Sequence, residues 1–340
     1  MLTAAVIGCG RIGSLWDAGR PGQDPLTHAG AHAAHPEVTL VAGVDPSPQR
    51  RIAFENRWDV PAYSSVQAMI EHARPALWSI CTPPEQHLPV AEAGLAAGAR
   101  ALWCEKPLAG ILADARALAE AAAAAGVPLA VNHGRRWDPA HRAAAAWLRQ
   151  GGIGRVLHVS IRYVRGIANY GSHAFDLVRM LTGDEIAWVC ATDDLREAHP
   201  DPSLTVVAGL QGGAALTLCP SPRDGDDLFE VDLLGDAGRL TLADMGRTIR
   251  AFRPAPGGGT GDGVLVPDAT WRFDEGLRAM ALAAAANLVA AVQDGAPLLS
   301  AGADGLAAMA AIEAARRSAA LGGRRVDLAA LLEIAPAARP

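Results

Sequence analysis

The first 131 residues alternate short apolar runs with alanine-rich segments of helical length. Runs of strand length occupy Leu2–Ile7, Thr39–Val44, Ala76–Cys81, Ala101–Cys104 and Val127–Val131. Between them lie segments such as Pro84–Ala97 and Leu112–Ala125, in which alanine, a strong helix former, predominates. Continuous apolar strands separated by helices indicate a parallel sheet that helices cover on both faces. We therefore expect residues 1–132 to form a doubly wound α/β domain.

A glycine-rich turn, Gly8-Cys9-Gly10-Arg11-Ile12-Gly13, leads from the first apolar run into a helical segment. Glycines in this pattern allow a tight turn, close approach of the backbone to a pyrophosphate and close packing of helix on sheet. The N-terminus of the helix adds a site for the phosphate charge. Strand, turn and helix follow in the required order, so the sequence predicts a Rossmann domain that binds a dinucleotide. The expected contacts come from Gly8, Gly10, Arg11, Ile12 and Gly13.

Asp45 ends the second apolar run, where an acidic side chain can bind the ribose hydroxyls of adenosine. It lies 32 residues after Gly13, whereas the usual spacing is about 20. We interpret Asp17–Leu26, with its prolines and glycines, as an insertion that accounts for the difference. A carboxylate at position 45 favours NAD over NADP because it would repel a 2′-phosphate, although Arg50 and Arg51 are nearby.

After residue 154 the pattern changes to strand-like runs with few helices between them. These runs occupy Arg155–Val164, Ala187–Ala191, Leu204–Leu210, Ala214–Cys219, Phe229–Leu234 and Thr248–Arg253. Helices are expected at Ser172–Leu181, Gly276–Asp294 and Gly302–Gly322, and a glycine-rich loop at Pro254–Gly263. The pattern predicts that residues 133–340 form an α+β domain with an open, largely antiparallel mixed sheet.

Lys106 is the only lysine in the chain, in which every other basic side chain except histidine is arginine. It follows the run Ala101–Cys104, at the edge where parallel sheets bind their ligands. Lysine can donate and accept a proton, whereas arginine cannot release one. We therefore predict that Lys106 exchanges a proton with a substrate hydroxyl as a hydride moves to or from nicotinamide. A structural lysine paired with Glu105, and a lysine that survived a coding bias, are the alternatives.

These motifs together resemble the Gfo/Idh/MocA oxidoreductases, and the resemblance covers nearly the whole chain. Besides the glycine-rich turn, it rests on Cys81-Thr82-Pro83-Pro84 with His87, Glu105-Lys106-Pro107, Asn132–Pro139, Gly151–Val156, Gly171–Gly183, Ser318 and Gly322-Gly323. It implies a Rossmann domain followed by a substrate-binding and oligomerisation domain. It places Thr82 and Pro83 along the cofactor near the nicotinamide.

The resemblance also implies roles for residues around Lys106. Glu105 and Lys106 would lie at the domain cleft, with a cis peptide bond before Pro107. His87 and Glu105 join the residues expected to bind the cofactor. Arg136 falls where the family binds substrate, and a guanidinium recognises carboxylate or phosphate.

A second group of polar residues lies within the run from Asn169 to Asp176. His173 and Asp176, three residues apart, share one face of a predicted helix. Many members of the family carry an aspartate where this chain has Asn169, and an amide cannot accept a proton. The resemblance therefore assigns the proton transfer to Lys106 and His173, and Asn169 is expected to orient the substrate or the lysine. Asp176 is expected beside the substrate as an orienting partner. Alternatively, His173 only caps or packs the helix.

Further candidates to line the substrate pocket are Tyr163, Arg165 and the inserted loop around Thr27 and His28. No metal site is expected, because the five cysteines and ten histidines lack the spacing of metal ligands. Nucleic acid and anionic membranes are poor partners for a chain of net charge −6 without a basic run. The absence of a predicted leader or membrane span, with cysteines placed as small apolar residues, leads us to expect a reduced, cytoplasmic protein.

The leading prediction is an NAD(P)-dependent dehydrogenase or reductase that acts on a ring hydroxyl or ketone of a sugar, cyclitol or sugar derivative. One alternative is an enzyme that retains NAD and cleaves a glycosidic bond through transient oxidation. Another is a non-catalytic sensor that binds NAD. The resemblance also implies a homodimer or homotetramer, because the family pairs its open sheets face to face.

Overall fold

The computed structural model describes residues 1–20, 23–195, 199–221, 227–255 and 264–333. The chain divides into two compact units. The first contains residues 1–137 and 278–306, and the second contains residues 138–277 and the described residues from 307 onward. The boundary expected after residue 132 thus differs from the structure, because residues 278–306 return to the first unit. They do so because helix α8 (Met280–Asp294) buries Ala284, Leu288 and Val289 in the core of that unit.

The first unit contains a six-stranded parallel sheet with the strand order β3-β2-β1-β4-β5-β6. Its strands are β1 (Leu2–Ile7), β2 (Val38–Val44), β3 (Ala62–Tyr63), β4 (Leu77–Ile80), β5 (Ala101–Cys104) and β6 (Leu129–Val131). The four residues of β4 and of β5 are all buried, as expected for strands covered on both faces. The predicted doubly wound domain is confirmed.

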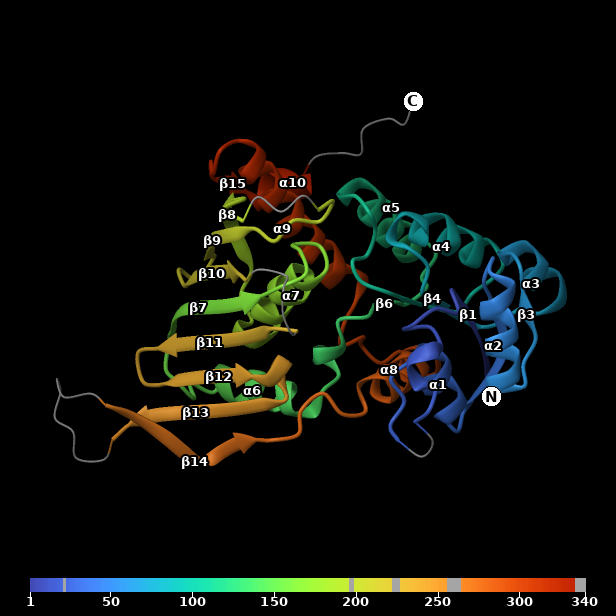
Figure 1. Ribbon diagram of the computed structural model, residues 1–340, viewed down its shortest axis with the longest axis horizontal. Helices are drawn as coiled ribbons and strands as arrows, with labels where there is room; N and C mark the ends of the chain where they lie inside the picture. Colours follow the sequence, from blue (N-terminus) through green and yellow to red (C-terminus); the bar gives the residue numbers. More distant parts are fainter. Residues whose placement is uncertain (21–22, 196–198, 222–226, 256–263, 334–340) are drawn as a thin grey trace. The chain divides into compact units, whose positions relative to one another are not determined.

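Helices lie on both sides of this sheet (Figure 1). The helices are α1 (His28–Ala34), α2 (Pro48–Trp58), α3 (Val66–His72), α4 (His87–Ala96) and α5 (Leu112–Ala124). Helices α1 and α8 pack together, and α4 and α5 form a second pair. Under α1 and α8, the rings of Trp103 and Trp137 meet edge to face with centroids 6.4 Å apart. This aromatic pair anchors the core on that face of the sheet.

The insertion divides the helix that follows the glycine-rich turn. The residues before and after the insertion still pair as they would in one continuous helix. The backbone N–H groups of His28 and Ala29 donate to the carbonyls of Ile12 and Gly13, at 3.1 and 3.0 Å. Donor and acceptor are 16 residues apart in each pair, whereas about four separate them in a continuous helix. About twelve residues are therefore added, which matches the excess in the spacing from Gly13 to Asp45.

The second unit contains a nine-stranded mixed sheet with the order β14-β13-β12-β11-β7-β10-β9-β8-β15. Its strands are β7 (Val156–Tyr163), β8 (Ile186–Thr192), β9 (Thr205–Leu210), β10 (Ala215–Pro220), β11 (Phe229–Gly235), β12 (Arg239–Ala243), β13 (Thr248–Pro254), β14 (Leu265–Phe273) and β15 (Val326–Asp327). Among the strands described for this sheet, only β7 and β10 pair in parallel, and the other pairs are antiparallel. The predicted mixed sheet is confirmed, and most of the expected loop Pro254–Gly263 lies outside the described residues.

Within the second unit, helices cover one face of this sheet, and its described helices leave the other face, which we call the open face, uncovered. Helices α6 (Pro139–Arg149) and α7 (Tyr170–Thr182) pack together, and α7 contacts β7. Figure 1 shows both helices behind the strands. On β7, Val159, Ile161 and Tyr163 are buried toward them, whereas Ser160 and Arg162 belong to the open face. This alternation is the period-two pattern from which the strand was predicted.

The chain closes with α9 (Gly302–Ala320) and the short helix α10 (Leu328–Glu333). The first residues of α9 belong to the first unit and the remainder to the second. Ser318 in α9 accepts the backbone N–H of Ala191 at 2.7 Å and donates to the carbonyl of Arg324 at 2.6 Å, so it ties the helix to β8. None of the described helices combines the length and apolarity needed to cross a membrane.

Candidate active site

The glycine-rich turn leaves β1 with a geometry that side chains would obstruct. Gly8 has φ +99°, and a Cβ atom there would lie 2.5 Å from the carbonyl oxygen of Cys81. A Cβ on Gly13 would collide with the carbonyl oxygen of Gly8. At Gly10, by contrast, the nearest atom would be Nη1 of Arg50 at 3.8 Å. The turn is therefore closed at its two ends and open at Gly10, where a ligand can approach the backbone.

Asp45 lies just after β2 with its carboxylate almost fully buried. Its Oδ2 accepts the backbone N–H of Cys9 at 3.0 Å, and its Oδ1 accepts that of Ser47 at 2.9 Å. Nη1 of Arg50 lies 3.5 Å from Oδ2, whereas Arg51 donates to the carbonyls of Asp45 and Pro46. The acid thus fixes the glycine-rich turn and keeps lone pairs for further donors such as ribose hydroxyls.

The loop after β4 carries Thr82 and Pro83, and His87 opens α4 beyond it. Thr82 Oγ1 is buried and has no hydrogen-bond partner among the described residues. His87 is fully buried, with Nε2 2.9 Å from the carbonyl of Thr82 and Nδ1 3.2 Å from that of Leu108. Burial lowers the pKa of His87 despite these two carbonyls. The expected cofactor contact by His87 is therefore replaced by bracing of the loop, because both ring nitrogens face backbone oxygens.

Glu105 follows β5 and is the centre of a buried hydrogen-bond network. Its Oε1 accepts Nε2 of His28 at 3.0 Å and Nδ2 of Asn132 at 2.5 Å. Its Oε2 accepts the backbone N–H of Lys106 at 3.2 Å. Burial alone would raise the pKa of Glu105, but the hydrogen bonds and charges of His28, Lys106 and Asn132 hold it below its usual value. Glu105 is therefore a carboxylate that stays ionised inside the protein.

Lys106 is half-buried and immediately follows this carboxylate. The peptide bond from Lys106 to Pro107 is cis, as the family resemblance implies. The strands β1, β4 and β5 are parallel neighbours, so the glycine-rich turn, Thr82 and Lys106 all leave the same edge of the sheet. The structure therefore brings the expected cofactor residues and the expected catalytic lysine to one edge.

Arg136 lies in a 3₁₀ turn (Gly134–Arg136) of the same unit and is mostly buried. Its guanidinium is 3.0 Å from the carboxylate of Asp304 and donates to the carbonyl of Leu299. Arg136 was expected to bind an anionic group of the substrate. In the structure it binds the carboxylate of Asp304 instead. The expected substrate contact has an internal competitor because residues 278–306 return to the first unit.

In the second unit, α7 carries the other expected catalytic residues. Asn169 precedes the helix, is exposed, and donates its backbone N–H to the carboxylate of Asp201 at 3.0 Å. His173 is half-buried with its ring edge-on to Tyr170, at a centroid distance of 6.3 Å. Asp176 is only 2% exposed. The side chain of Asp176 therefore suits an orienting role better than direct contact with a substrate.

Tyr163, which was expected to line the substrate pocket, lies in the core of the second unit. Its side chain is fully buried, and its hydroxyl donates to the carbonyl of Leu204 and accepts the N–H of the same residue, both at 2.7 Å. The only hydrogen of this hydroxyl is thus donated inside the core, which favours a structural role for Tyr163. Arg165, in the left-handed region with φ +65°, is paired with Asp227.

Sequence reasoning missed the position of Asn132 and gave His28 only a general place in the pocket. Asn132 follows β6 at the same sheet edge as Glu105, and its N–H donates to the carbonyl of Cys104 at 2.8 Å. The rule that ligand residues follow parallel strands would have found it. No rule predicts the partner of His28, which is 77 residues away along the chain.

Two features of this edge fit a dinucleotide. The backbone at Gly10 is open where a pyrophosphate approaches, and Thr82 Oγ1 is a buried polar atom without a partner among the described residues. Asp45 adds a buried acceptor at the end of β2. Among the described residues, no cluster of histidine, cysteine and acidic side chains is placed to hold a metal ion.

The comparison with protein families decides the class of the chain. A model of the oxidoreductase family with an NAD-binding Rossmann fold, Gfo/Idh/MocA, matches residues 2–133. Residues 2–133 thus carry the NAD-binding Rossmann fold of the Gfo/Idh/MocA family. The chain is an oxidoreductase that binds NAD, as the sequence predicted.

Two dehydrogenases of known name match over most of the chain. A D-apiose dehydrogenase of Paraburkholderia graminis is 29% identical over 308 residues, which cover 81% of this chain and 79% of the relative. An inositol 2-dehydrogenase of Rhizobium meliloti is 27% identical over 339 residues, which cover 93% of this chain and 96% of the relative. The solved structure of an Agrobacterium radiobacter oxidoreductase with NAD⁺, L-tartaric acid and magnesium is 22% identical, with a TM-score of 0.76 over 97% of this chain and 99% of that one. At that identity the structural match shows the fold alone.

Proposed function

We propose that this chain is an NAD-dependent dehydrogenase or reductase that acts on a ring hydroxyl or ketone of a sugar or cyclitol. The observation that carries the proposal is the position of Lys106, the only lysine, at the sheet edge that also carries the glycine-rich turn and Thr82. The names of the relatives, D-apiose dehydrogenase and inositol 2-dehydrogenase, support this substrate class.

In this mechanism the residues of the chain bind, orient and move a proton. NAD would supply the hydride chemistry when bound. Gly8, Gly10, Arg11, Ile12 and Gly13 would hold its pyrophosphate, Asp45 would hold the adenosine ribose, and Thr82 and Pro83 would lie along the cofactor. The Nζ atom of Lys106 takes the proton from the substrate hydroxyl during oxidation and returns it during reduction.

The residues of α7 support the same chemistry from the second unit. We assign to His173 the second proton-carrying role, because an imidazole exchanges protons near neutral pH. Asn169 hydrogen-bonds the substrate without accepting a proton, and Asp176 orients the residues beside it. Arg136 has a reduced role as a substrate ligand in this proposal because Asp304 already pairs with it.

A substrate screen followed by substitution of Lys106 tests the proposal. D-apiose and myo-inositol, with a wider set of aldoses and cyclitols, are tested with NAD⁺, and the corresponding ketones with NADH, by absorbance of NADH. Lys106→Ala and Lys106→Arg are each expected to lower kcat by about 10²- to 10⁴-fold on the substrate found, because neither side chain can exchange the proton. Binding of NADH, measured by fluorescence, should stay within about threefold of wild type.

Two outcomes of this experiment would contradict the proposal. One is near-normal turnover by Lys106→Arg, because arginine keeps the positive charge but cannot release a proton to the substrate. The other is cleavage of glycosides without net production of NADH, which would instead indicate an enzyme that retains NAD.

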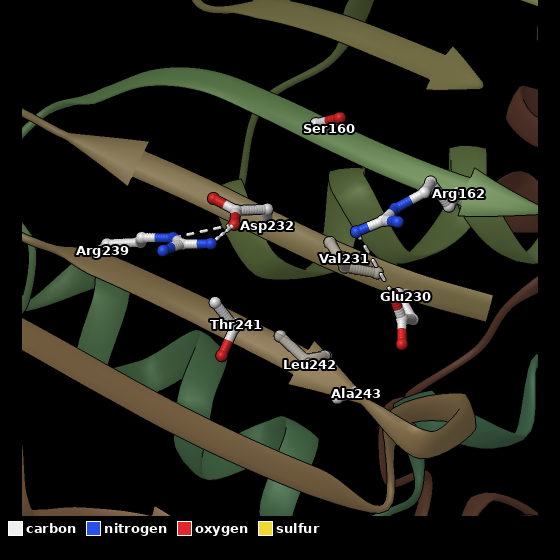
Figure 2. Close-up of a pocket in the computed structure, with 9 residues that line it drawn as sticks. All are labelled: Ser160, Arg162, Glu230, Val231, Asp232, Arg239, Thr241, Leu242 and Ala243. Atoms are coloured by element: carbon white, nitrogen blue, oxygen red, sulfur yellow. Dashed lines mark hydrogen bonds and ion pairs between the residues drawn. The ribbon is translucent and has the colours of Figure 1, made fainter. Parts of the chain in front are cut away.

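We also propose that the chain forms a homodimer or homotetramer through the open face of the nine-stranded sheet, and that it works in the cytoplasm. A row of aligned residues crosses that face through Val207, Thr217, Ser160, Asp232 and Thr241. Beside this row is a cavity of about 300 Å³, with the ion pairs Arg239–Asp232 and Arg162–Glu230 on its wall (Figure 2). All five cysteines are thiols, which is typical of a reducing compartment.

A further inference from the structure

His28 is buried beside the candidate catalytic lysine and contacts its neighbour directly. Nε2 of His28 lies 3.0 Å from Oε1 of Glu105, and the side chain of His28 is 1% exposed. The imidazole ring also lies against the indole of Trp103, with centroids 3.7 Å apart and planes inclined by 33°. The ring is therefore held by packing in the orientation that brings Nε2 to the carboxylate.

The chemistry of this contact fixes which atom carries the proton. The carboxylate of Glu105 can only accept, so Nε2 of His28 must carry the hydrogen. Nδ1 is buried and has no hydrogen-bond partner among the described residues, so the ring reaches Glu105 through Nε2. His28 thus acts as a donor, in the same way as the amide of Asn132 on the same oxygen.

Hydrogen bonds also hold the backbone next to His28. Thr27 caps α1, with its Oγ1 accepting the backbone N–H of Gly30 at 3.0 Å. The buried carboxylate of Asp17 accepts the backbone N–H groups of Leu26 and Thr27, at 2.7 and 3.2 Å, and the hydroxyl of Thr27. Asp17 therefore fixes the end of the insertion at the residue that precedes His28.

We propose that His28 is a positioning residue for Lys106 that acts through Glu105. Its N–H holds Oε1 of Glu105, and this leaves Oε2 aimed at the backbone N–H of Lys106, 3.2 Å away. The chain Asp17, Thr27, His28, Glu105 thus connects the inserted segment to the lysine. The placement of Lys106 by His28 does not depend on the function proposed above. Only the claim that this placement serves proton transfer rests on that function.

The test uses the fact that Lys106 is the only lysine in the chain. Lys106 and the N-terminal amine are the only amines that an acylating reagent such as acetic anhydride can modify, and peptide mass spectrometry separates these two sites from each other and from acylated cysteine or tyrosine. The rate at Lys106 is measured from pH 6 to about 10, around the range in which lysine titrates. No substrate is needed for this measurement.

Removal of the N–H donor of His28 is expected to make Lys106 more reactive toward the acylating reagent. In His28→Leu, the buried carboxylate loses a hydrogen bond and either turns away or takes up a proton. The first change loosens the backbone at Lys106, and the second removes a negative charge that favours its ammonium form. We expect acylation at pH 8 to be faster by on the order of tenfold, the size of coupling between groups in direct contact.

Helix α1 supplies a matched control one turn further on. His32 is equally buried and meets the same Trp103 edge to face, but its Nε2 faces Ser79 at 2.8 Å rather than Glu105. His32→Leu should therefore leave the rate at Lys106 unchanged. His28→Gln, which retains an N–H donor of similar reach, should restore the wild-type rate. If His28→Leu does not fold, His28→Asn, whose amide is too short to reach Glu105, replaces it.

A double substitution shows whether His28 acts through the carboxylate. In a Glu105→Gln background, His28→Leu is expected to add no further change in the acylation rate. Equal effects of His28→Leu and His32→Leu on the acylation rate would overturn the inference. It would also be overturned if His28→Leu changed this rate equally in the wild-type and Glu105→Gln backgrounds. If acylation responds as expected but Lys106→Arg retains turnover, His28 positions Lys106 and the proposed catalytic role of Lys106 is what fails.

Discussion

Glu105 is the residue around which the site of the first unit is arranged, and the sequence revealed only part of this. Its place after β5 and beside Lys106 could be predicted, because parallel strands end at the same edge of a sheet. Its partners His28 and Asn132 could not be predicted. Their positions depend on how α1 and β6 pack, and side-chain direction at long sequence separation leaves no local signal.

Asp45 is the residue at which cofactor choice can be tested. In Asp45→Ser, loss of the carboxylate removes both an acceptor for ribose hydroxyls and the charge that repels a 2′-phosphate. We expect kcat/KM for NAD to fall by about tenfold, which corresponds to about 1.4 kcal/mol, and that for NADP to rise. The ratio of the two values measures the change.

Arg50 provides the control for this prediction, because its Nη1 lies 3.5 Å from the carboxylate of Asp45. In Asp45→Ser, the guanidinium becomes available to a phosphate, so the additional change Arg50→Ala should remove the gain with NADP. A double variant that uses NADP as well as Asp45→Ser does would show that Arg50 plays no part.

Tyr163 shows why a predicted site residue can prove structural. Its place at the end of a strand suggested a pocket, but spacing does not show where a phenol hydroxyl points. Because the hydroxyl satisfies both the N–H and the carbonyl of Leu204, Tyr163→Phe should lower the free energy of unfolding by about 1–3 kcal/mol. Calorimetry measures the loss, and kcat/KM is expected to stay the same.

The matched control for this substitution is Tyr63→Phe. Tyr63 is half-buried in the first unit, and its ring stacks on His72 with centroids 5.6 Å apart. Removal of its hydroxyl should change the unfolding temperature little. A larger loss for Tyr63→Phe than for Tyr163→Phe would refute the structural role assigned to Tyr163.

At the scale of elements, buried strands were predicted better than edge strands. The bounds of β1 and β5 agree with the apolar runs, because both strands are covered on two faces. The structure adds β12 and β14, which the sequence did not indicate. β12 has only five residues, although Leu240 and Leu242 alternate with Thr241. β14 is an edge strand of half-buried or exposed residues that contains a proline, so it has no clear apolar pattern.

The interrupted helix yields a prediction that depends on phase. Deletion of residues 16–27 joins Leu15 to His28 and leaves His28 four residues after Ile12, as in an unbroken helix. The Rossmann fold and the affinity for NADH should survive, the latter within about threefold. Fluorescence titration and circular dichroism are the measurements.

A deletion that is one residue shorter is the control. Removal of residues 16–26 joins Leu15 to Thr27 and rotates the remainder of α1 by about 100°. His28 and His32 would then leave the Trp103 face, and we expect a lower unfolding temperature and weaker binding of NADH. Equal behaviour of the two deletions would show that the hydrogen bonds from His28 and Ala29 do not set the phase of the helix.

At the scale of the whole molecule, the two fold classes followed from hydrophobic periodicity, but the division of the chain did not. The segment from 278 to 306 reads as an ordinary alanine-rich helix and its connection, and nothing local shows which core it joins. That membership depends on contacts with Trp103 and Trp137. The surface proposed for assembly has no local sequence signal either, because the open face of the second sheet exists only after its strands have paired.

Asp232→Arg tests the proposed assembly. The change places a third positive charge beside Arg239 and Arg162 on the open face. Repulsion between two copies should convert the proposed oligomer into a monomer, which sedimentation velocity would detect. Glu92→Arg, a charge reversal at an exposed position of α4, is the control and should leave the sedimentation coefficient unchanged. A monomeric wild-type protein, or equal sedimentation of both variants, would contradict the assignment of this face.

The return of residues 278–306 to the first unit has a consequence for how the chain folds during synthesis. Helix α8 supplies Ala284, Leu288 and Val289 to a core that also contains Leu2 and Trp103. The ribosome must therefore translate the whole intervening segment, residues 138–277, before the nucleotide-binding unit can close its core. Until then the nascent chain exposes the indole rings that α8 covers, so the N-terminal unit is the one that needs protection from aggregation during translation.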